Sequence, residues 1–165
     1  MSKLYKKVAV GGTWDRLHKG HDVILKKTFE IGENIYIGVV ASEELLKQKE
    51  LKEIIEPYEK RVDNLLEYIR KLNPNKKFKI IPLYDKYSIT TSDPELEALV
   101  VSQLTLESGK EINEIRKKRG LKELDLIVVD MVLAEDNGLL CSTRIRKNEI
   151  DREGKLIKKG SYHKA

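Results

Sequence analysis

The sequence contains a single cysteine, Cys141, and no apolar run approaching the roughly 20 residues that a membrane span requires. One cysteine excludes an internal disulfide, and its spacing from the three histidines does not match a metal site. The chain also opens without the basic and apolar leader of an exported protein. We therefore expect a soluble protein of a reducing cytoplasm, in which Cys141 is a small apolar filler.

The length and charge of the chain limit its organisation and its partners. At 165 residues the chain is long enough for one well-filled core, so we predict one domain over residues 1–150 and a polar, basic tail over 151–165 that frays. The net charge is +5, but the excess lies on Lys-rich helix faces and in the tail rather than in one aromatic-studded patch. This distribution argues against nucleic acid and is sufficient for a polyphosphate ligand.

One stretch, residues 8–21, organises the rest of the chain. A short apolar strand over residues 5–10 is stopped by Gly11 and Gly12, and His18 and His21 then open a helix that ends at Gly32. The unpaired N–H groups and the dipole of a helix start attract anions. Such a helix with merely solvated histidines is the alternative interpretation.

The coincidence of several residue types favours function over that alternative. Thr13 supplies a hydroxyl beside the two imidazoles of His18 and His21, and Gly20 leaves room between them. All of these residues lie in a strand-turn-helix context. The stretch therefore predicts a phosphate-binding turn.

The remaining chain alternates between strand and helix patterns. Further strands are predicted over residues 34–41, 78–84, 96–102 and 124–134. Helices are predicted from Ser42, from Pro57 to Asn73, and over 109–120. We therefore predict an α/β fold with an open, mostly parallel, five-stranded Rossmann-like sheet and helices on both faces.

A second anion site is predicted near the end of the chain. Ser142 and Thr143 can cap a short helix that carries Arg146 and runs to about Ile150. We expect Arg146 to be exposed, because nothing in the pattern requires it for stability. Lys49, by contrast, lies in a lysine cluster that spacing alone assigns to a solvated helix face.

Two segments resemble a known family. The segment Gly12-Thr-Trp-Asp-Arg-Leu-His-Lys-Gly-His21 resembles the G-T-F-D-x-L-H-x-G-H signature of nucleotidyltransferases. The double glycine before Thr13 and the segment Ser142-Thr-Arg-Ile-Arg146 are similar to phosphopantetheine adenylyltransferases of the archaeal and eukaryotic type. Two positions depart from the family. Trp14 replaces the usual phenylalanine, which changes the pocket wall, and Leu104 replaces a glutamate that contacts nucleotide.

The resemblance implies a reaction and a set of site residues. The reaction is adenylyl transfer from ATP to 4′-phosphopantetheine, which gives dephospho-coenzyme A and pyrophosphate, with Mg²⁺ carried by the nucleotide and no metal ligand from the protein. The implied catalytic residue is His21, assisted by His18 and Lys49. The residues implied to bind the acceptor phosphate are Thr13 and Lys49. The implied ATP-binding residues are Gly12, Thr13, Asp15, Gly20, His21, Ser142, Thr143 and Arg146. Arg61 also aligns with a family arginine, although a surface ion pair explains it equally well.

The residues themselves leave other functions open. No nucleophile is paired with a base, so the motifs favour direct transfer between two bound substrates. A cytidylyltransferase or flavin adenylyltransferase shares the first motif and differs in its acceptor. A non-catalytic nucleotide-binding or nucleic-acid-binding protein is the alternative of a different class. The oligomeric state is open.

Overall fold

The computed structural model describes residues 4–47, 49, 51–72 and 74–157, and within them the chain forms one parallel five-stranded sheet. The strand order is β3-β2-β1-β4-β5, and every neighbouring pair is parallel. The strands are β1 (Tyr5–Gly12), β2 (Gly32–Val40), β3 (Lys77–Leu83), β4 (Ala98–Val101) and β5 (Asp125–Val128). The predicted fold class is confirmed.

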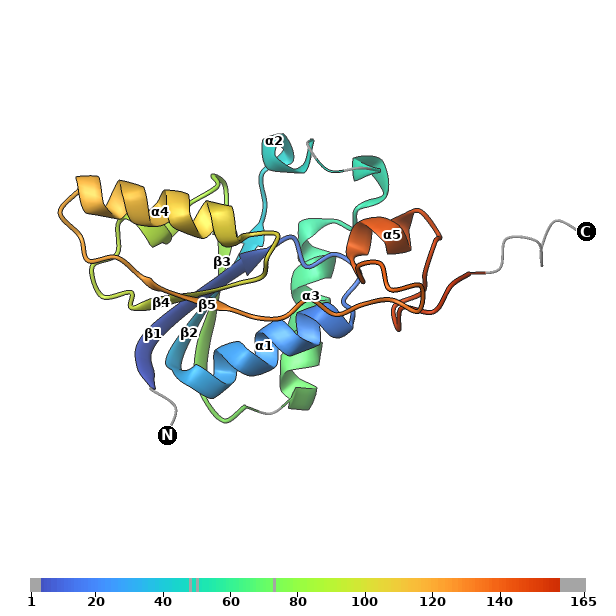
Figure 1. Ribbon diagram of the computed structural model, residues 1–165, viewed down its shortest axis with the longest axis horizontal. Helices are drawn as coiled ribbons and strands as arrows, with labels where there is room; N and C mark the ends of the chain where they lie inside the picture. Colours follow the sequence, from blue (N-terminus) through green and yellow to red (C-terminus); the bar gives the residue numbers. More distant parts are fainter. Residues whose placement is uncertain (1–3, 48, 50, 73, 158–165) are drawn as a thin grey trace, which may run out of the picture.

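Helices cover both faces of this sheet (Figure 1). The longer helices are α1 (Lys19–Ile31), α3 (Tyr58–Leu72) and α4 (Leu106–Lys118). The short elements are α2 (Glu43–Leu46), η1 (Lys52–Ile54), η2 (Ser88–Thr91) and α5 (Ser142–Arg146). Ser42 stands at the N-cap of α2, but its side chain makes no capping hydrogen bond. No described helix has the length and the apolar composition of a membrane span.

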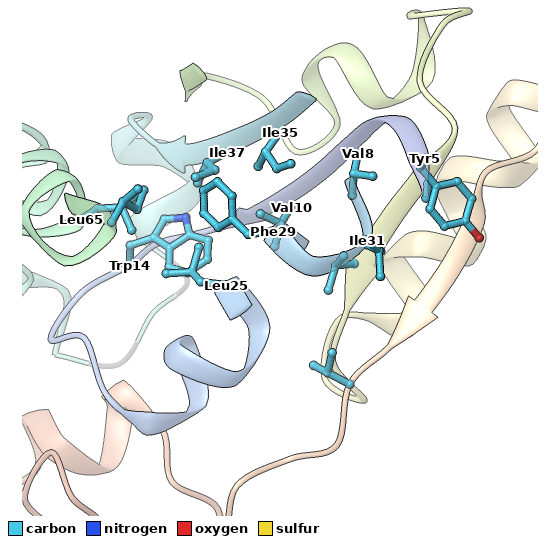
Figure 2. Packing of buried hydrophobic residues seen from close by; sticks show 14 of the residues in the cluster. Tyr5, Val8, Val10, Trp14, Leu25, Phe29, Ile31, Ile35, Ile37 and Leu65 are labelled. Atoms are coloured by element: carbon cyan, nitrogen blue, oxygen red, sulfur yellow. The ribbon is translucent and has the colours of Figure 1, made fainter. Parts of the chain in front are cut away.

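Alternation along the strands divides the core between the two faces. Val8 and Val10 of β1 pack with side chains of α1 and α3, whereas Ala9 between them packs with Ile112 of α4. Figure 2 shows the first of these clusters, in which Leu25 and Phe29 of α1 and Leu65 of α3 lie against the strands. A side-chain period of two thus lets one strand supply both halves of the core.

Gly32 joins α1 directly to β2 and ends the helix where the sequence predicted. Its φ of −114° is accessible to any residue, so positive φ does not explain the glycine. A Cβ at this position would lie 2.8 Å from Ile35 Cδ1 and 2.9 Å from Val8 Cγ2. The glycine is therefore explained by close packing between the connection and the sheet.

Two predicted segments differ from the structure. The strand predicted over 124–134 ends at Val128, because β4, its neighbour, ends at Val101, and Leu133 instead forms an antiparallel bridge with Leu139. The apolar residues beyond Val128 supply a small separate cluster with Ile150. Residues 151–157, predicted to fray, are held by hydrogen bonds and by a bridge between Ile150 and Leu156, while 158–165 lie outside the described residues.

The strand order places a switch point between β1 and β4. The chain moves outward from β1 to β2 and β3, and then crosses to β4 and β5 on the other side. Ligands of open α/β sheets bind beyond the carboxyl ends of the strands at such a point. The turn after β1, which contains the predicted phosphate-binding residues, begins there.

A buried arginine ties the segment around η2 to α4. Arg116 is fully buried, and its Nη1 donates to Thr90 O at 2.9 Å and to Asp93 O at 3.0 Å, while its Nε donates to Lys122 O at 2.7 Å. Burial lowers the pKa of this guanidinium, so its charge is held at a cost that the three carbonyl groups offset.

We expect Arg116→Met to lower the free energy of unfolding by about 3 kcal/mol, because the apolar side chain leaves those carbonyl groups without their donor. Arg119→Met, one turn on and exposed, should cost less than about 1 kcal/mol. Urea denaturation of both variants measures the difference. Equal losses would show that the buried arginine is not what fixes this segment.

Candidate active site

The turn after β1 is built on two strained residues. Trp14 has φ +58° and Arg16 has φ +50°, a region that residues other than glycine rarely occupy. The Trp14 side chain is buried in the core, and its Nε1 donates to Gly38 O at 2.8 Å. The indole therefore anchors the turn to the core and to β2. The sequence instead predicted that Trp14 changes the wall of the pocket. Gly12 precedes it, and a Cβ there would lie 3.3 Å from the indole.

His18 and His21 form a reciprocal capping pair at the start of α1. His18 is the N-cap, and its Nδ1 accepts from Gly20 N at 3.0 Å, while His21 Nδ1 accepts from His18 N at 3.2 Å. The two ring centroids are 3.9 Å apart. A Cβ on Gly20 would lie 2.8 Å from His18 Cε1, so the predicted need for room at this position is explained.

Both imidazoles are neutral near pH 7. The pKa of His18 is lowered to about 4, mainly by burial and to a smaller extent by the positive charge of Arg152. The pKa of His21 is lowered to about 3, mainly by burial and to a smaller extent by His18. In a neutral ring whose Nδ1 accepts a hydrogen bond, the proton is inferred to lie on Nε2. Each histidine thus presents an uncharged N–H donor.

Asp15 connects the turn to the second predicted site. Its carboxylate is fully buried and lies 2.7 Å from Arg16 Nη1 and 3.0 Å from Arg146 Nη1. It also accepts from Glu56 N at 3.1 Å, which ties it to the segment that follows Lys49. Asp15 therefore binds side chains and backbone of the protein and holds Arg146 in place.

The structure changes the interpretation of α5. The N-cap is Cys141, and no side chain caps the helix; Ser142 Oγ donates instead to Asp15 O at 2.5 Å. Thr143 Oγ1 accepts from Arg146 Nη2 at 3.2 Å. The Arg146 side chain is only 2% exposed, so the expectation of an exposed guanidinium was wrong. Burial beside Asp15 supplies the structural requirement that the sequence pattern did not reveal.

Arg61 is a further residue of this region, for which the sequence left a family role and a surface ion pair equally open. It is buried, and its Nη1 donates to Thr13 O at 2.7 Å while its Nε donates to Glu56 O at 2.8 Å. The signal was available, because Arg61 falls on the same four-residue spacing as the buried Leu65 and Ile69 of α3. The Thr13 hydroxyl, by contrast, is buried without a partner among the described residues.

An apolar cavity of about 410 Å³ adjoins the turn beyond the carboxyl ends of the strands. Gly12, Thr13 and Lys49 are among its lining residues, as are Tyr36 and Tyr87. The pKa of Lys49 is lowered, mainly by desolvation of its ammonium group and to a smaller extent by the positive charge of Arg146. Averaged over all its atoms, the residue is nevertheless exposed.

The site residues thus divide into two groups. One group lines the cavity and contains Gly12, Thr13 and Lys49. The other group does not line it and contains His18, His21, Ser142 and Arg146. Leu104 is 65% exposed and does not line the cavity either. The described residues contain no group of three His, Cys, Asp or Glu side chains that could hold a metal ion.

A family model described as cytidylyltransferase-like matches residues 9–148. The chain belongs to this family. A curated protein named phosphopantetheine adenylyltransferase from Methanothermobacter thermautotrophicus is 45% identical over 159 residues, which cover 96% of this chain and 94% of that protein. A protein of the same name from Pyrococcus furiosus is 39% identical, and the match covers 96% of this chain and 98% of that protein. These relatives confirm the resemblance inferred from the two motifs.

A solved structure supports the fold of this cytidylyltransferase-like domain. A protein with unknown function from Archaeoglobus fulgidus matches with a TM-score of 0.67 and 28% identity, over 76% of this chain and 99% of that one. A lipopolysaccharide core biosynthesis protein from Thermoplasma volcanium has a TM-score of 0.57 at 17% identity and shows the fold alone.

The lowered pKa values predict how stability depends on pH. The unfolded chain takes up protons near the ordinary histidine pKa of 6.5, whereas the folded domain takes them up near 4 and 3, so the free energy of unfolding falls as pH drops below about 6.5. His21→Gln keeps a capping side chain at this position and cannot titrate. We expect its stability to fall less between pH 7 and pH 5 than that of the wild type, as measured by urea denaturation. Parallel pH profiles of the two proteins would contradict the assignment.

The burial of Arg146 predicts a cost for a substitution that keeps its charge. Lys lacks the planar fork that reaches both Asp15 and Thr143, so Arg146→Lys should lower the free energy of unfolding by about 2–3 kcal/mol. Arg16→Lys is the matched control, because it alters the other guanidinium on Asp15, whose side chain is 21% exposed, and should cost less than about 1 kcal/mol. Chemical denaturation compares the two variants, and a cost at Arg146 no larger than at Arg16 would exclude this role.

Proposed function

We propose that this domain transfers the adenylyl group of ATP to 4′-phosphopantetheine, giving dephospho-coenzyme A and pyrophosphate. The observation that carries the proposal is the junction at Asp15, which brings the histidine turn and α5 together beside an apolar cavity. The names of relatives that match along nearly their whole length support the same reaction.

The acceptor fits the lining of the cavity. The unpartnered Thr13 hydroxyl and the Lys49 ammonium are suited to the acceptor phosphate, and the apolar walls are suited to the long pantetheine arm. Lys49 has no described ion pair, so its charge is available to a phosphate. The two residues keep the roles that the resemblance implied for them.

The transfer is a direct displacement. A phosphate oxygen of the acceptor forms a bond to the α-phosphorus of ATP, the bond from that phosphorus to the bridging oxygen breaks, and pyrophosphate leaves with the electron pair. Pyrophosphate leaves as an anion, so no proton needs to be supplied. The protein's contribution is to position both reactants and to stabilise charge on the phosphoryl oxygens.

His21 and His18 serve this reaction as neutral donors. Their inferred Nε2–H groups at the start of α1 can stabilise the oxygens of the α-phosphate in the transition state. We assign the β- and γ-phosphates to the start of α5, where Ser142 and Thr143 lie and where Arg146 contributes positive charge from its buried position beside Asp15.

Mg²⁺ belongs to the nucleotide in this proposal. Its ligands would be the phosphate oxygens of ATP, where the ion would neutralise negative charge. The cytoplasmic location and the absence of a nucleic-acid partner stay predictions from the sequence.

A pyrophosphate-release assay tests the proposal. The purified protein should release pyrophosphate from ATP only when 4′-phosphopantetheine is present. Replacing ATP by CTP, or the acceptor by flavin mononucleotide, tests the two related reactions. If ATP binds but no pyrophosphate is released with either acceptor, the protein is a nucleotide-binding protein without this activity.

We expect His21→Ala to lower turnover by about a hundredfold or more while ATP affinity changes little, because the donor acts on charge that develops in the transition state. His21→Gln retains a neutral N–H donor and the capping position, and should recover part of the loss. Steady-state kinetics and calorimetric titration with ATP measure the two effects. A parallel loss of turnover and of ATP affinity would assign His21 to ground-state binding instead.

A further inference from the structure

The chain after α5 forms a hydrogen-bonded turn, residues 151–155, which we call the C-terminal turn. Asp151 Oδ1 accepts from Glu153 N and from Lys155 N, each at 2.9 Å, and Asp151 N donates to Lys155 O at 2.9 Å. The bridge between Ile150 and Leu156 closes its base. Arg152 therefore lies within a turn whose backbone is hydrogen-bonded on both sides of it.

This turn is anchored near the start of α1. Gly154 O accepts from Glu135 N at 2.7 Å, and Ile150 is fully buried. Leu140 joins the two regions, since its Cδ1 is 3.5 Å from where a Cβ on Gly154 would stand, and its O is 3.7 Å from where a Cβ on Gly20 would stand. Figure 1 likewise shows α5 and the red segment after it beyond the first turn of α1.

Arg152 differs from the other cations around α5. Arg144 is held by Asp136 at 2.6 Å and by Glu149 at 2.9 Å, and Lys155 lies 3.7 Å from Glu153. Arg152 makes no ion pair or side-chain hydrogen bond with any residue that the structure describes. Its positive charge nevertheless acts on His18, since it is the second cause, after burial, of the lowered pKa of that histidine.

Arg152 is exposed and has no described ion pair, so its positive charge is available to an anion at this place. The one fully buried carboxylate of the site, Asp15, is already shared by Arg16 and Arg146. Lys49 lies on the side of the cavity, whereas Arg152 approaches from the side of α5 and does not line the cavity. A polyanion that lies across the starts of α1 and α5 would neutralise it.

We propose that Arg152 is a further nucleotide-binding residue, which contacts the terminal phosphates of ATP from the C-terminal turn. This inference rests on the proposed function, because it needs a triphosphate at the starts of α1 and α5. Arg152 does not line the cavity proposed for the acceptor, so we expect it to leave acceptor binding unchanged.

Calorimetric titration of Arg152→Gln with ATP, pyrophosphate and AMP tests the assignment. We expect the dissociation constants of ATP and pyrophosphate to rise about tenfold, as for one charge-assisted hydrogen bond, while that of AMP stays unchanged. Arg152→Lys should recover part of the loss. Lys155→Gln is the matched control, because it removes the same charge from the same turn, and it should leave all three constants near those of the wild type.

The controls separate the possible failures. Unaltered ATP and pyrophosphate binding by Arg152→Gln, an equal loss in Lys155→Gln, or an equal loss for AMP would each overturn the inference while the wild type still transfers adenylyl groups. Wild-type protein that binds neither ATP nor pyrophosphate would overturn the proposed function as well. An independent measurement is the pKa of His18 by NMR, which should rise in Arg152→Gln and not in Lys155→Gln if Arg152 faces the site.

Discussion

The buried carboxylate of Asp15 is the constraint on which the arrangement of the site depends. A carboxylate removed from water is tolerated only when its oxygens are paired and hydrogen-bonded. Here the partners are Arg16 beside it in the chain, Glu56 N from 41 residues away, and Arg146 from 131 residues away. The two motifs and the segment after Lys49 are therefore assembled around one charge.

The histidine pair follows a complementary rule. Both rings lie at a helix start, where positive charge is unfavourable, and burial removes the remaining tendency to protonate. Each Nδ1 is occupied by a backbone N–H, which leaves Nε2 to act as the donor. Two uncharged donors suit a displacement in which the leaving group departs as an anion. The strained turn at Trp14 and Arg16 brings them to the end of β1.

The sheet supplies the second half of the site. Its two faces are covered unequally, because α1 and α3 pack on one face while α4 packs on the other (Figure 1). The cavity lies on the α4 side of the carboxyl ends, with Ile112 of α4 and Tyr36 of β2 among its lining. Arg116 of α4 fixes the η2 segment that closes it. The η2 segment and the cavity it lines thus depend on the same buried guanidinium.

The sequence by itself determined the fold class and the position of the turn after β1. Alternating strand and helix periods and the two glycines after residue 10 are local signals, and the structure follows them closely. The end of β5 could not be read in the same way, because it depends on where the neighbouring strand stops. A strand's length is a property of the pair.

Only the tertiary structure decided which polar residues are buried. Arg61 and Arg116 stand on the apolar stripes of their helices, so their burial had a local signal that charge concealed. Arg146 had none, because its partner Asp15 is distant in the chain and the ion pair exists only after folding. Local propensity is encoded within a few residues, whereas the pairing of buried charges depends on the whole fold.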